Sequence, residues 1–94
     1  MDRLHRTGSA ASENMAVTGH VFNTVIQIIR QKREAGKEPS NALFIADIVP
    51  AMPAYRSEEI KAALNALCKQ RFLRYGRTMN DVYFILAEEN NADI

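Results

Sequence analysis

The side chains in this chain best suited to chemistry are cations that can bind anions. Residues 54–77 hold six basic residues against two acidic ones, Glu58 and Glu59, for a net charge of +4. The six are Arg56, Lys61, Lys69, Arg71, Arg74 and Arg77. Residues 78–94 hold four acidic residues and no basic one, for a net charge of −4. Because a cluster of one charge attracts the opposite charge, this asymmetry indicates a polyanion-binding face beside an acidic tail.

The sequence shows no pattern typical of a catalytic or metal site. His5 and His20 have no ligand partners at a metal-binding spacing. Cys68, the single cysteine, lies on the apolar side of a predicted helix, where a free thiol acts as a small hydrophobic group. Glu58 and Glu59 are adjacent, so on a helix they point about 100° apart and form no acid–base pair. There is also no glycine-rich phosphate loop, and we expect neither an enzyme nor a bound cofactor.

Length and composition predict one small domain. The 94 residues can build a single core, and 47% apolar with 24% charged residues is typical of a soluble globular protein. No apolar run approaches the roughly 18 residues of a membrane span, and the N-terminus lacks the core of a signal peptide. We therefore expect a cytoplasmic protein with no membrane contact. It would have a flexible tail over residues 1–16, a domain over 17–87 and an acidic tail over 88–94.

The first half of the domain predicts a helix, a short strand and a short helix. The helix runs from Thr18, as N-cap, to Ala35, and Gly36 ends it. Six branched or aromatic residues on one arc of this helix are expected in the core: Val21, Phe22, Val25, Ile26, Ile28 and Ile29. A short buried strand over 43–45 follows, and Asp47 is expected to cap a helix that begins at Ile48.

The second half predicts a longer helix and a hairpin. The helix spans 57–70, with Ser57 as N-cap. Its apolar face comprises Ile60, Ala63, Leu64, Leu67 and Cys68, and its opposite face Glu58, Ala62, Asn65, Ala66 and Lys69. After Gln70, aromatic and β-branched residues predict two antiparallel strands within 72–86, with the hairpin tip near 77–81.

This order of elements resembles the winged helix-turn-helix fold. The stretch IADIVPAMPAYRSEEIKAALNALCKQRFLRY is similar to the paired helices and first wing strand of small transcription regulators, and the resemblance covers about residues 18–86. It implies an α+β domain of three helices plus a two-stranded hairpin, and it allows a short third strand. The helix over 57–70 would be the recognition helix, and the hairpin over 72–86 the wing. Many family members have glycine after the recognition helix. Here Gln70 or Arg71 stands there, so we expect the helix to end differently.

The resemblance implies a regulator that docks its recognition helix in the major groove of double-stranded DNA. Lys61, Ala62 and Asn65 would lie nearest the bases, since lysine donates to guanine, asparagine pairs with adenine and alanine contacts a thymine methyl group. Basic side chains would hold phosphates, which supply much of the affinity. The full predicted set is Arg56, Ser57, Lys61, Ala62, Asn65, Lys69, Arg74 and Arg77.

Two other interpretations of the same residues stay open. Winged helices also serve as protein-interaction or assembly modules without DNA, and the alanines, the paired glutamates and the near-neutral total charge of +1 suit that alternative. A homodimer is compatible with either function. Each basic residue taken singly could also be a solvated surface charge.

Overall fold

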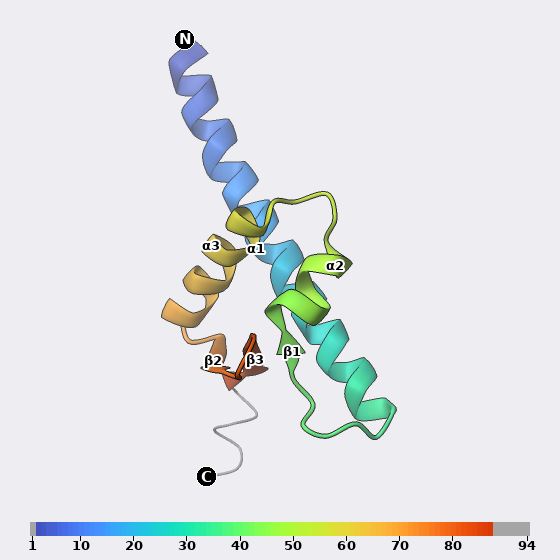
Figure 1. Cartoon of the computed structure of the whole chain (residues 1–94). Helices are drawn as coiled ribbons and strands as arrows, with labels where there is room; N and C mark the ends of the chain where they lie inside the picture. Colours follow the sequence, from blue (N-terminus) through green and yellow to red (C-terminus); the bar gives the residue numbers. More distant parts are fainter. Residues whose placement is uncertain (1, 88–94) are drawn as a thin grey trace.

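The computed structural model describes residues 2–87, with side chains from residue 16 onward. They form a small α+β domain in the order α1 (Asp2–Glu34), β1 (Ala42–Leu43), η1 (Phe44–Ile48), α2 (Val49–Ala51), α3 (Ser57–Lys69), β2 (Leu73–Arg77) and β3 (Val82–Leu86). Figure 1 shows α1 passing along α3, α2 and β1, with its N-terminal turns extending beyond the other elements. The C-terminal tail predicted over 88–94 lies outside the described residues.

Helix α1 contributes one buried stripe to the core. Val21, Val25 and Ile29 lie four residues apart, so they share one face of the helix, and each is at most 1% exposed. The helix ends at Glu34, and Gly36 just beyond it has a φ of 75°, a left-handed conformation that glycine adopts without strain. The N–H groups of Gly36 and Lys37 then donate back to the carbonyls of Arg33 and Lys32. The predicted stop at Gly36 is confirmed.

The three strands form one antiparallel sheet in the order β1-β3-β2. Tyr75 of β2 pairs with Phe84 of β3, and Ala42 of β1 pairs with the other side of Phe84. Leu73 and Phe84 point into the core. The hairpin and its tip are confirmed as predicted. The short third strand is also present, but it spans Ala42–Leu43 and not 43–45, because Phe44 and Ile45 already belong to η1. Strand β2 therefore lies at an edge of the sheet.

Helix α3 packs against α1 and contributes a second buried face to the core. Its apolar face is buried as predicted, through Ile60, Ala63, Leu64 and Leu67, while Cys68 is half-buried. The core joins these to the α1 stripe, to Ile48 and Met52, and to the sheet residues Ala42, Leu73 and Phe84. One continuous core thus fixes α1, α3 and the sheet relative to one another.

Helix α3 ends with a left-handed residue that is not glycine. Arg71 has a φ of 68°. The N–H of Phe72 donates to the Leu67 carbonyl at 2.9 Å, and that of Arg71 to the Cys68 carbonyl at 3.0 Å. These two bonds make the same motif that Gly36 makes at the end of α1. The expectation that this exit would be built differently was wrong, since Arg71 adopts the backbone conformation that usually favours glycine.

Three predicted helix starts were wrong. Helix α1 begins at Asp2 and not at Thr18, because no proline stops the helix upstream of that threonine; it includes most of the predicted tail, whose flexibility stays a prediction. Ser57 is the first helical residue of α3, one position after the N-cap. The helical turn expected from Ile48 already begins at Phe44, so Asp47 lies inside it and does not cap it.

Candidate nucleic-acid interface

The predicted base-reading residues lie on the solvent side of α3. Lys61, Asn65 and Lys69 are spaced four residues apart and all are exposed. With this spacing they follow one another along one stripe of the helix, facing away from Ile60 and Leu64. The stripe places an amide between two ammonium groups, an arrangement that suits hydrogen-bond acceptors and anions.

Lys61 also connects this stripe to the helical turn before it. Its Nζ lies 6.0 Å from the centre of the Phe44 ring in η1, at the outer range of a cation–π contact. The ring is partly buried against the core. The Lys61 stem therefore lies over η1 while the residue as a whole stays exposed.

Ala62 is exposed on α3 beside this stripe, on the side that faces α1. It lines a hollow of about 470 Å³ between α3 and α1, together with Glu58, Glu59, Val17 and Thr18. At about 100° per residue, Ala62 lies about 100° around the helix from Lys61 but only about 20° from Lys69. Lys61, Asn65 and Lys69 therefore share one face of α3 with Ala62, and Glu58, four residues before Ala62, lies on that face too.

The start of α3 uses one of those glutamates structurally. The Glu59 carboxylate accepts the backbone N–H of Arg56 at 2.9 Å. This contact is half of a capping box and places negative charge at the positive end of the helix. The side chains of Arg56 and Ser57 are exposed at the same end, so both can reach a ligand that approaches the N-terminus of α3.

The two predicted wing residues lie on the edge strand. Arg74 and Arg77 are both exposed on β2, and Arg77 is the last paired residue before the turn. Between them Gly76 lies directly under the ring of its partner Tyr83, where a Cβ would collide with ring atoms. The glycine is therefore required by the close approach of the tyrosine.

Asp81 ties the hairpin to η1. Its carboxylate accepts the backbone N–H groups of Ile45 (2.9 and 3.1 Å) and Ala46 (3.1 Å), and that of Val82 at 2.7 Å. Burial raises the pKa of this carboxyl group, but the N–H donors of Ile45, Val82, Ala46 and Phe44 together outweigh burial and leave the pKa below its usual value. The hairpin thus has a fixed position relative to η1.

A second tie holds η1 against α1. The Asp47 carboxylate accepts the backbone N–H of Leu43 at 2.9 Å and pairs with Lys32 Nζ at 2.6 Å. Both partners of the ion pair are partly buried. Lys32 therefore has a structural role, and the basic end of α1 is not simply a free cationic patch.

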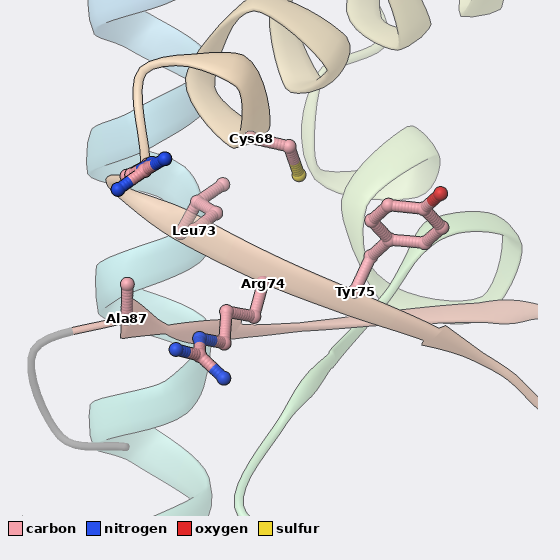
Figure 2. Close-up of a pocket in the computed structure, with 6 residues that line it drawn as sticks. Cys68, Leu73, Arg74, Tyr75 and Ala87 are labelled. Atoms are coloured by element: carbon pink, nitrogen blue, oxygen red, sulfur yellow. The ribbon is translucent and has the colours of Figure 1, made fainter. Parts of the chain in front are cut away.

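A hollow at the edge of β2 is lined by two side chains that sequence reasoning did not select as site residues. Arg71 and Tyr75 line it with Arg74, Cys68, Leu73 and Ala87, and its volume is about 480 Å³ (Figure 2). Arg71 had been noted for its charge and for its place directly after the helix, but not as a site residue. That place, where the chain must turn sharply to enter β2, was the signal that could have identified it.

Neither a metal centre nor a membrane-spanning helix is present in the part of the chain that the structure describes. No group of three or more His, Cys, Asp or Glu side chains among the described residues could hold a metal ion. No described helix is long and apolar enough to cross a bilayer.

Comparisons with known proteins give no family for this chain. No family model, curated protein or solved structure matches it. Function must therefore be argued from the residues and their geometry.

Proposed function

We propose that the chain is a winged helix-turn-helix protein that binds double-stranded DNA, as transcription regulators do. The observation that carries this proposal is the exposed Lys61, Asn65 and Lys69 stripe on α3, opposite that helix's buried face. An α-helix fits the major groove, where lysine and asparagine can read guanine and adenine. Helix α3 enters the groove, and this stripe faces the bases.

The arrangement of the other elements supports the same proposal. Strand β2, with Arg74 and Arg77, follows α3 after a short exit, so the hairpin is a natural wing over the neighbouring phosphates. Arg56 and Ser57, at the N-terminus of α3, contact phosphates of the DNA. Asp81 keeps the wing attached to η1, which reduces the entropy lost when both surfaces bind together.

Ala62 lies on the same face of α3 as Asn65 and Lys69, so it can contact a thymine methyl group in the same orientation of the helix. Glu58 lies on this face too and comes close to the bases with it. Glu59 is held by the Arg56 N–H and stays at the helix start.

Binding of a labelled duplex by matched lysine variants tests this function. Lys61→Gln removes a cation from the stripe, and Lys37→Gln removes an exposed cation beyond the end of α1. We expect Lys61→Gln to weaken binding about 5- to 100-fold, the range for one specific base contact, and Lys37→Gln to change it little. Equal effects of both variants would mean that α3 is not the binding surface.

A second candidate function is protein interaction through a groove between α1 and α3. The groove has a volume of about 380 Å³ and is lined by Phe22, Leu67 and Phe72, with Gly19 and Ala66 among its small residues. Phe72 is 51% exposed, although its ring lies against Phe22. An exposed aromatic side chain in such a groove suits a second copy of the chain. A dimer in sedimentation that Phe72→Gln dissociates, together with no DNA binding, would favour this candidate.

A further inference from the structure

The hollow at the edge of β2 has a definite chemical character. Two guanidinium side chains, Arg71 and Arg74, line it, and the exposed ring of Tyr75 lies at the opposite end from Ala87 (Figure 2). Arginine forks favour carboxylates and phosphates, while the ring offers a flat apolar surface. The ligand that fits is therefore an extended, acidic segment.

Strand β2 adds a backbone surface to this hollow. It is an edge strand, so the N–H and C=O groups on its outer side have no strand partner within the sheet of the described residues. An extended segment can add to such an edge by main-chain hydrogen bonds. A second copy of β2 is a poor occupant, because its own Arg74 and Arg77 would be brought against the same charges.

The chain itself supplies an acidic segment next to this hollow. Ala87, which lines the hollow, is the last described residue, and its N–H donates to the Phe72 carbonyl at 3.1 Å. The sequence then continues as EENNADI, with Glu88, Glu89 and Asp93 and no basic residue. Seven extended residues reach about 23 Å, which is ample for a hollow that begins where the segment starts.

We propose that residues 88–94 dock in the hollow lined by Arg71, Arg74 and Tyr75 and compete there with the polyanion that this face binds. The docked carboxylates neutralise the two guanidinium groups. A phosphate must then displace them, so the tail lowers affinity for weak, non-specific duplexes more than for a site with good base contacts. The competition rests on the proposed function, whereas docking of the tail does not.

Docking is tested in the full chain without DNA. Glu88→Gln with Glu89→Gln removes two tail charges, and Glu34→Gln with Glu38→Gln makes the same change in charge near the far end of α1 as a control. Cys68 lines the hollow and is the only cysteine, so its alkylation by uncharged iodoacetamide reports whether the hollow is covered. Backbone amide NMR shifts of Arg71, Arg74 and Tyr75 give a second readout.

We expect Cys68 of the tail variant to be alkylated about two- to tenfold faster than Cys68 of the wild type, the change that the loss of two exposed ion pairs would cause. The amide NMR signals of Arg71, Arg74 and Tyr75 should also shift. The control variant should match the wild type. Salt of about 0.5 M should raise the alkylation rate of the wild type toward that of the tail variant, because salt screens exposed charges. If tail and control variants behave alike, or if neither readout changes, the docking proposal is overturned.

A DNA titration then separates competition from docking. If the chain binds duplex, the tail variant should bind a random duplex about two- to tenfold more tightly than the control variant. Faster alkylation without any DNA binding would preserve docking and overturn the proposed function. Faster alkylation with equal duplex affinity for both variants would preserve docking and overturn competition.

Discussion

The carboxylate of Asp81 accepts the backbone N–H of Ile45 through both oxygens, at 2.9 and 3.1 Å, although the residues are 36 positions apart. This contact, with the Ala46 N–H beside it, joins the hairpin turn to the first turn of η1. Charge-assisted hydrogen bonds of this kind are the stronger ones in proteins. Asp81 is therefore the residue that positions the hairpin relative to η1.

Replacing Asp81 by asparagine should destabilise the domain. An amide accepts hydrogen bonds less strongly than a carboxylate and presents only one oxygen to three backbone donors. We expect a loss of about 1–2 kcal/mol in the free energy of unfolding, discounted for the solvent exposure of the site. Urea unfolding at pH 7 measures it. Asp81→Asn stability equal to the wild type would show that these bonds add no net stability.

The same contact predicts a dependence of stability on acid. The folded-state pKa of Asp81 lies below its usual value, so the unfolded state takes up the proton first as the pH falls. The contribution is fully present above the unfolded pKa of about 4 and is lost as the pH drops through the lower folded pKa. The gap between wild type and Asp81→Asn in urea unfolding should therefore shrink below about pH 4. A gap that stays constant down to pH 2.5 would contradict this assignment.

Gly76→Ala should be destabilising by about 1–3 kcal/mol, because the new methyl group has to displace the Tyr83 ring. Gly19→Ala is the matched control: it adds the same group within α1, where nothing lies within 4 Å, and should stabilise the domain by about 0.5–1 kcal/mol. Thermal unfolding of both variants measures the contrast. If Gly76→Ala unfolds at the same temperature as the wild type, the Tyr83 ring moves aside at no cost, which would contradict this prediction.

Arg71→Gly should raise the free energy of unfolding. The left-handed conformation costs a non-glycine residue about 1–2 kcal/mol, which glycine would relieve. The greater conformational entropy of glycine in the unfolded chain offsets about 0.4–1 kcal/mol of this gain in stability. A net gain of about 0.5–1 kcal/mol remains. Arg71→Ala keeps the strain and should give no gain. If both variants change stability alike, charge and not backbone conformation controls this position.

Sequence reasoning succeeded where one local pattern dominates. Three features require only neighbouring residues to be recognised: the stripe of Val21, Val25 and Ile29, the aromatic and β-branched residues of the two hairpin strands, and Gly36. The order of elements and the hairpin followed from these patterns.

Two of the misses arose where a partner is distant in sequence. Asp47 was expected to cap a local helix, but it bonds Leu43 and pairs with Lys32 of α1. Asp81 was counted as an acidic residue of the hairpin tip and not as a ligand of η1, since nothing local signals the N–H groups of η1. The predicted DNA-binding residues are exposed, as expected of a binding face, and the groups that position them were not recognisable from the sequence.

Variants of Asn65 and Arg77 distinguish base reading from phosphate binding. Arg77→Ala, at the exposed end of β2, should weaken binding to all duplexes alike and reduce the slope of log K against log salt by about 1. Asn65→Ala should instead change the preference among sequences, by about 1–3 kcal/mol at one base pair. Affinity selection on a random duplex library measures both effects. Equal losses on every duplex for both variants would show that Asn65 does not read bases.

The most direct test of the central claim is fluorescence anisotropy of a labelled random duplex with the full chain at about 50 and 200 mM salt. We predict micromolar-range binding at the lower salt that weakens by orders of magnitude at the higher one, as expected for several phosphate contacts. A folded protein that shows no binding at the lower salt would contradict the proposed DNA-binding function.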